Sequence, residues 1–78
     1  MTEKSLIDLK LNEIALIKKV VIEDEKIKVQ LSNLGFLVGE EIKLLNYNYN
    51  KESYLVKVMN INYAIDKKIC ERIIVCGK

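Results

Sequence analysis

Two sets of residues in this 78-residue chain have side chains that could do chemistry. Cys70 and Cys76 carry thiols that could bind a metal ion, and the runs Glu23–Glu25 and Glu40-Glu41 could supply paired carboxylates. The chain has no histidine, which is the commonest transition-metal ligand and the usual proton carrier in catalysis. This absence excludes the serine–histidine and cysteine–histidine pairs on which many hydrolases depend.

The two cysteines are weak candidates for a metal site. Five residues separate them, unlike the closely spaced pairs of zinc fingers, and no further cysteine completes a set of four ligands. Free cysteine is among the most buried residue types. We therefore expect Cys70 and Cys76 to lie in or near the core without a disulfide, with metal binding across a dimer interface as the alternative.

The acidic runs have no nucleophile beside them in the sequence. Adjacent carboxylates usually face solvent or stabilise the start of a helix. We predict that the protein is not an enzyme and requires no cofactor.

Two glycines, Gly35 and Gly39, lie close together in the segment LSNLGFLVGEEI, residues 31–42. A phosphate-binding loop needs the pattern GxxxxGK[ST], in which a lysine and backbone N–H groups meet the phosphates. Here the spacing is different, and Glu40-Glu41 follow where the lysine is required. We predict that both glycines form backbone corners with positive φ angles.

Composition indicates one folded domain, residues 1–78, with a small core. Half of the residues are hydrophobic and 31% are charged, so the chain is not disordered by composition. The net charge of +2 is too balanced for a nucleic-acid-binding protein. The amino terminus does not resemble a signal peptide, and the longest apolar runs fall far below the ~20 residues that span a bilayer. We expect a cytoplasmic protein.

Hydrophobic periodicity predicts a mainly β protein. Residues 14–22 are rich in β-branched side chains and indicate a strand, with a bulge or sharp bend at Lys18 and Lys19. Asp24 can cap a helix that runs to about Leu34, with Ile27, Leu31 and Leu34 on its apolar stripe. Alternating apolar residues after Gly39 predict further strands, joined by a loop at 46–53, a turn at 60–62 and a helical turn at 66–71 that Asp66 caps, before a last strand at 72–76. Short strands with short connections favour a small β-barrel.

The tyrosines fall into two groups. Tyr54 and Tyr63 lie in strand patterns and are expected in the core. Tyr47 and Tyr49 flank the asparagine-rich loop, where they could contact a partner.

Three motifs in this order resemble the FeoA family: SLIDLK at 5–10, LSNLGFLVGEEI at 31–42 and NYAIDKKICERIIV at 62–75. The resemblance covers about Leu6–Val75. The sequence departs from the family pattern at four places: it lacks arginine near Gln30 and near Asp66, proline at the Val38 position and glycine near Asn12. Asparagine enters the left-handed region more easily than most residues, so the last change is tolerable.

The resemblance implies an SH3-like β-barrel of about five strands, with one short α-helix and a short helical turn before the last strand. It also implies an accessory protein of bacterial ferrous iron uptake that docks on the cytoplasmic GTPase domain of the iron transporter. Candidate contact residues are Phe36, Leu37, Tyr47 and Tyr49, of which Phe36 and Leu37 could equally belong to the core. The alternatives are an interaction module acting with a metal-dependent transcriptional regulator, since some iron- and manganese-dependent repressors carry this domain, and a weak transition-metal-binding protein.

Overall fold

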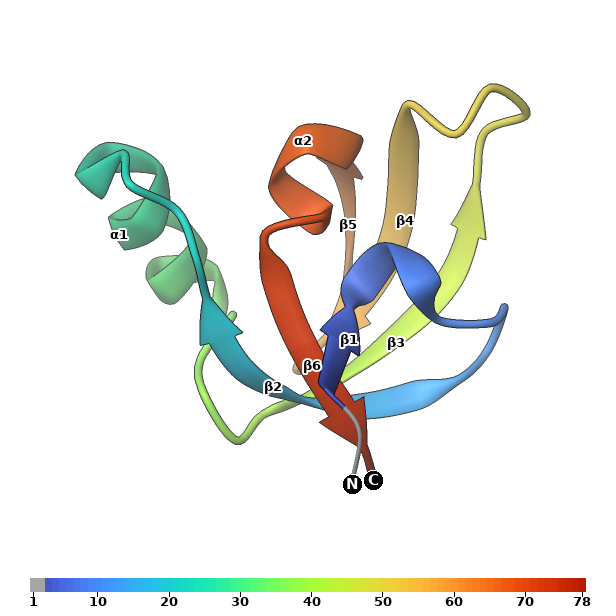
Figure 1. Cartoon of the computed structure of the whole chain (residues 1–78), viewed down its shortest axis with the longest axis horizontal. Coiled ribbons are helices and arrows are strands. Elements are labelled where there is room, and N and C mark those ends of the chain that lie inside the picture. The colour runs from blue at the N-terminus through green and yellow to red at the C-terminus, as the bar shows by residue number, and fades with distance from the viewer. Residues whose placement is uncertain (1–2) are drawn as a thin grey trace.

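The computed structural model describes residues 3–78, which form one antiparallel sheet with one α-helix and two short helical turns (Figure 1). In chain order the elements are β1 (Glu3–Ser5), the 3₁₀ turn η1 (Leu6–Asp8), β2 (Ile14–Val20), α1 (Glu25–Leu34), β3 (Glu41–Tyr47), β4 (Ser53–Val58), β5 (Ile61–Asp66), α2 (Lys67–Cys70) and β6 (Ile73–Gly77). The mainly β prediction is confirmed. No helix within this part of the chain is long and apolar enough to cross a membrane.

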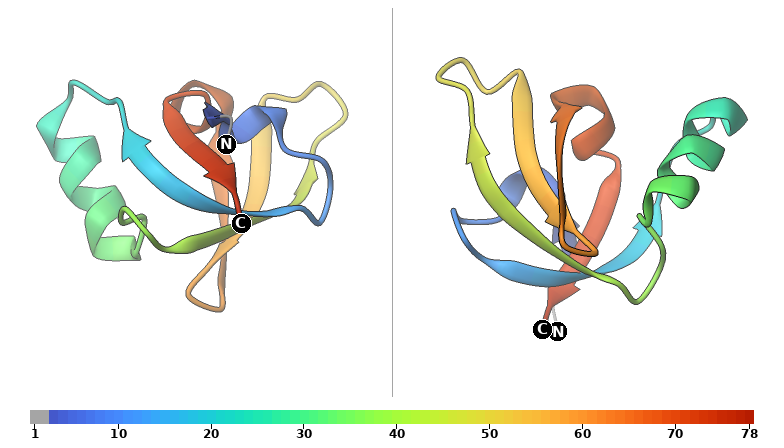
Figure 2. Two further views of the ribbon diagram at one scale, coloured as in Figure 1. Left: turned by 60° about the horizontal axis from the view of Figure 1, so that its bottom comes forward. Right: turned by 180° about the vertical axis from the view of Figure 1, so that it is seen from behind.

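The sheet has the strand order β1-β6-β2-β3-β4-β5 and curls around the core (Figure 2). It has six strands rather than about five, because the three-residue strand β1 pairs with β6 through Lys4 and Val75. A strand this short carries no hydrophobic alternation that sequence could show. Within residues 3–78 no hydrogen-bonded ladder joins β1 to β5, so the sheet is not closed as a hydrogen-bonded barrel would be.

The predicted bulge in β2 is confirmed. Where β2 pairs with β6, the register shifts between Ile17 and Lys19. Strand β2 ends at Val20, two residues earlier than the predicted strand.

Helix α1 begins and ends as predicted. The Asp24 carboxylate accepts a hydrogen bond from the Lys26 N–H at 2.9 Å, which caps the first turn. At the other end, Gly35 is left-handed with φ +103°, and its N–H donates to the Ser32 carbonyl. The Phe36 N–H then donates to the Leu31 carbonyl at 2.9 Å. These two bonds make a Schellman motif, in which the residue after the glycine packs on the helix.

The apolar stripe of α1 is narrower than predicted. Leu31 is buried and Ile27 packs partly against the core, but Leu34 is 38% exposed. The helix therefore rests on the sheet mainly through its middle turns and the residue after Gly35.

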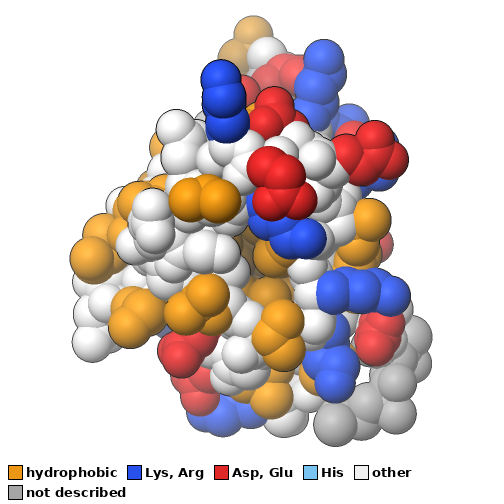
Figure 3. Space-filling model, turned by 90° about the vertical axis from the view of Figure 1, so that its left-hand side faces the viewer, with side chains coloured by type: hydrophobic (Ala, Val, Ile, Leu, Met, Phe, Trp, Pro, Cys, Tyr) orange, Lys and Arg blue, Asp and Glu red, His pale blue; other side chains and the backbone are white. Residues whose placement is uncertain are grey.

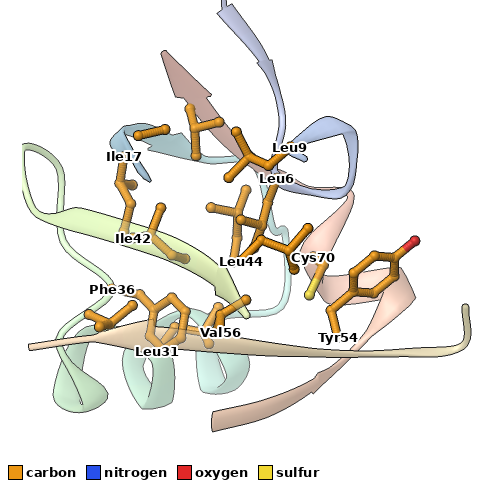
Figure 4. Packing of buried hydrophobic residues seen from close by; sticks show 14 residues of the cluster. Leu6, Leu9, Ile17, Leu31, Phe36, Ile42, Leu44, Tyr54, Val56 and Cys70 are labelled. Atoms are coloured by element: carbon orange, nitrogen blue, oxygen red, sulfur yellow. The ribbon is translucent and has the colours of Figure 1, made fainter. Parts of the chain in front are cut away.

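The core fills the inside of the curled sheet (Figure 4). Alternate residues of the central strands point inward and are buried, as the period-two pattern predicted. They are Ile42 and Leu44 on β3 and Tyr54, Val56 and Val58 on β4. Tyr54 is confirmed as a core residue, while Tyr63 packs against the core and is partly exposed.

Two local predictions were wrong. The β4–β5 connection is the pair Met59-Asn60, with φ angles of +53° and +65°, and not residues 60–62. Asn60 belongs to both the predicted and the observed turn, but methionine rarely adopts positive φ, so the sequence did not indicate that the turn begins at Met59. Asp66 occupies the cap position of α2 but makes no side-chain cap hydrogen bond. The first N–H of this turn, that of Lys67, donates to the Glu52 carbonyl at 2.9 Å.

Candidate docking surface

The structure separates the four predicted contact residues. The segment after α1, which holds Phe36 and Leu37, lies at one end of the molecule, and the β3–β4 loop with Tyr49 lies at the opposite end (Figures 1 and 2). Each end is therefore a separate candidate surface.

Phe36 belongs to the core. It is 2% exposed, and its ring lies 5.6 Å from the ring of Tyr63. The Schellman motif turns its side chain toward Leu31 and the sheet. Of the predicted pair at this end, only Leu37, at 45% exposed, offers surface to a partner.

At the other end, Tyr47 is partly buried and Tyr49 is 97% exposed. The ring of Tyr47 packs 5.7 Å from that of Tyr54, and the Lys51 Nζ lies 5.2 Å from its centre. Tyr47 is thus held by its neighbours. Tyr49 stands alone as an exposed aromatic side chain on this loop.

Leu37 is part of a larger group of exposed hydrophobic side chains, which we name the apolar patch. Its members come from the end of α1, the segment after it and the β4–β5 turn: Leu34, Leu37, Val38, Met59 and Ile61. Figure 3, which views the molecule from the α1 side, shows hydrophobic side chains gathered on the lower left of this face.

Two contacts join the segments that carry the apolar patch. The Tyr63 hydroxyl donates to the Leu34 carbonyl at 3.2 Å, which ties β5 to the end of α1. Met59 packs over the backbone of Gly35. Of the apolar patch, the sequence analysis predicted only Leu37 as a contact residue. The β4–β5 turn lies far from Leu37 in the sequence, with 20 residues between Val38 and Met59, so no local pattern indicated that the two segments meet.

A groove of about 560 Å³ adjoins the apolar patch along the outer face of β2, β3 and β4. Met59 belongs to both, and Gly39 directly follows Val38. The groove is lined by Ile14, Leu16, Gly39, Glu40, Glu41, Ile42, Lys43, Lys57, Met59 and Asn60. Apolar side chains and both signs of charge therefore meet there.

The corners that shape this surface are as predicted. Gly35 has φ +103° and Gly39 has φ +92°. Asn12, near which the family pattern has a glycine, has φ +67°. The Gly39 N–H donates to the Ile17 carbonyl at 2.8 Å, which brings the segment after α1 back onto β2. Gly35 and Gly39 are structural corners.

The cysteines are packed inside the protein and both are free thiols. Cys70 is fully buried on α2, its Sγ donates to the Ile65 carbonyl at 3.6 Å, and burial raises its thiol pKa to about 12. Cys76 on β6 is 6% exposed. A thiol that stays protonated at neutral pH is a poor metal ligand, since thiolates bind metals. Among residues 3–78 no three cysteine, aspartate or glutamate residues gather as a metal site would require.

Comparison with known proteins identifies the family of this chain and solved structures with a similar fold. A family model for the FeoA domain matches residues 4–76. None of the curated protein sequences matches the chain. The structure of Stenotrophomonas maltophilia FeoA complexed with zinc, described as a prokaryotic SH3 domain protein, is 27% identical, with a TM-score of 0.80 over 92% of this chain and 88% of that chain. The predicted SH3-like fold is thereby confirmed.

Two further solved structures contain the same fold as part of a longer chain. The solution structure of iron(II) transport protein A from Clostridium thermocellum is 27% identical, with a TM-score of 0.83 over 91% of this chain and 43% of that chain. The crystal structure of T. acidophilum IdeR is 23% identical, with a TM-score of 0.85 over 100% of this chain. This chain spans 35% of that protein, and the likeness shows a shared fold alone.

Proposed function

The chain belongs to the FeoA domain family, and on this premise we propose that it is a cytoplasmic accessory protein that docks on the GTPase domain of a ferrous iron transporter. Family membership implies a role in ferrous iron transport. The docking step, the partner and the surface are our proposal.

The observation that carries the proposal is the apolar patch. Exposed hydrophobic side chains that are scattered singly need no explanation, but five that are contributed by two joined segments mark an interaction surface. Such patches form the centres of protein–protein interfaces, with charged residues around them. The groove with Lys43 and Lys57 supplies such a charged border on one side.

The role we propose is recognition without chemistry. Docking energy in an interface of this kind comes from a few anchors. Leu37, Val38 and Met59 are the anchors we propose, at 45%, 69% and 59% exposed. Burying them against the partner removes apolar area from water and so drives association.

The test is a titration of isotope-labelled protein with the transporter's isolated cytoplasmic GTPase domain, followed by amide chemical shifts. We expect shifts at residues 34–39 and 59–61. Val38→Asp places a charge in the patch and should weaken binding at least tenfold, which is about 1.4 kcal/mol. Val29→Asp is the matched control, since Val29 is an exposed valine of α1 outside the patch.

Other outcomes of the titration would redirect the proposal. Shifts confined to the β3–β4 loop would assign docking to Tyr47 and Tyr49 instead. No shifts at high micromolar partner concentration would contradict docking on this domain. Binding to a metal-dependent repressor instead would favour the regulator-associated role, for which the shared fold with IdeR gives only weak support.

A further inference from the structure

Two lysines face one another on the outer surface of the sheet. Lys43 of β3 is the register partner of Lys57 of β4. Residues directly opposite on antiparallel strands place their side chains on the same face, with Cβ atoms roughly 5 Å apart. On either side the row continues with Ile14 of β2 opposite Lys43 and Asn62 of β5 opposite Lys57.

This row contains no carboxylate. Among residues 3–78 the salt bridges are Lys4–Glu13, Lys19–Glu3 and Lys78–Glu41, so neither lysine of the pair takes part in one. Glu41, the acidic residue two positions from Lys43 on the same strand face, is already paired with Lys78. Like charges directly opposite one another destabilise a sheet. Within residues 3–78 neither Lys43 nor Lys57 has a carboxylate at salt-bridge distance that would offset this repulsion directly.

The two lysines also line the groove beside the apolar patch. Lys43 is partly buried there and Lys57 is exposed. Ile14, Leu16 and Met59 give the same groove an apolar wall. A ligand in the groove would therefore meet two ammonium groups next to aliphatic side chains.

We propose that this groove binds an acidic side chain of the docking partner, an Asp or Glu that has an aliphatic residue beside it. This inference rests on the proposed docking function. It specifies the kind of partner side chain that contacts the groove beside the apolar patch. The partner's carboxylate lies between the Lys43 and Lys57 ammonium groups and relieves their repulsion, while its aliphatic neighbour contacts Ile14, Leu16 or Met59. The apolar patch and the lysine pair then form one continuous interface.

The charges of the groove favour a carboxylate over a phosphate group. Its lining holds Lys43 and Lys57, but also Glu40 and Glu41, so it has no net positive charge. Phosphate and nucleic-acid backbones require an excess of positive charge. A single carboxylate needs only the local pair, and the apolar wall suits a peptide segment.

Reversing one charge of the pair separates binding from stability. In Lys57→Glu, a carboxylate at position 57 faces Lys43 and replaces the repulsion with attraction, so the variant should unfold at a higher temperature than the wild type. The same variant should bind the transporter's isolated GTPase domain about tenfold more weakly, because the partner's carboxylate now meets a carboxylate. Binding by wild type should also weaken with added salt, and this dependence should diminish in the variant.

Lys68→Glu is the matched control, since Lys68 is an exposed lysine of α2 that does not line the groove. It carries the same change of net charge and should leave the affinity within twofold. Unchanged binding by Lys57→Glu, together with loss of binding by Val38→Asp, would overturn this inference and leave docking intact. Equal weakening by Lys57→Glu and Lys68→Glu would overturn it as well, because only net charge would then matter. Failure of the wild type to bind would overturn both.

Discussion

The Sδ atom of Met59 lies 2.6 Å from the point at which a Cβ atom on Gly35 would stand. The corner that ends α1 and the turn that joins β4 to β5 are therefore packed against each other, and a side chain at position 35 would have to displace Met59. This contact holds together the two segments that carry the apolar patch.

Gly35→Ala should destabilise the protein by about 2 kcal/mol or more, because alanine is strained at φ +103° and its methyl group would displace Met59. Gly39→Ala is the control, since φ is +92° there and no atom lies within 4 Å of the added Cβ. It should cost about 1 kcal/mol, from backbone strain alone. Chemical denaturation measures both. Equal losses would show that Met59 moves aside freely.

Phe36→Ala should lower the free energy of unfolding by about 3–5 kcal/mol, because it empties the space between Leu31 and Tyr63. Leu37→Ala, one residue along, should change it by about 0.5 kcal/mol or less, since Leu37 is half-exposed. Thermal unfolding followed by circular dichroism distinguishes the two. A comparable loss in Leu37→Ala would contradict its assignment to the docking surface.

Asp24→Ala should cost about 1 kcal/mol of stability, because the Lys26 N–H loses its acceptor at the start of α1. Asp66→Ala should cost less, roughly 0.5 kcal/mol at most, since the Asp66 carboxylate makes no cap hydrogen bond. Urea unfolding of the two variants provides the comparison. The cap assignment at α1 fails if their order is reversed.

The buried thiol of Cys70 makes stability depend on alkaline pH. Burial raises its pKa from 9.0 to about 12, so the folded state keeps the proton that an unfolded chain releases. This contribution is complete below about pH 9 and is lost as the pH rises toward 12, by up to about 1.4 kcal/mol per pH unit. The free energy of unfolding of the wild type should therefore fall more steeply above pH 9 than that of Cys70→Ala. Parallel curves would contradict the raised pKa.

Local rules were enough to predict the corners, the helix and the central strands. Positive φ is sterically open to glycine, so Gly35 and Gly39 could be predicted as bends from the sequence. The positive φ of Asn12 was anticipated only through the family resemblance, since asparagine tolerates this region. The 3.6-residue and two-residue periods of apolar side chains likewise located α1 and the buried faces of β3 and β4. These signals depend on neighbours within a few positions of the chain.

The candidate surface depended on relations that no local signal carries. Phe36 and Leu37 are adjacent hydrophobic residues, and only docking of α1 on the sheet buries the first and leaves the second exposed. Met59 and Ile61 join Leu37 because the β4–β5 turn packs on Gly35, far away in sequence.

Lys43 opposes Lys57 only in the observed register of β3 and β4, which shifts between Leu44 and Asn46. A slip of one residue would send one lysine to the other face of the sheet. The bends, the helix and the buried faces of the strands thus followed from the sequence alone. Which side chains meet on the surface was decided only in the tertiary structure, through the pairing of strands distant in sequence.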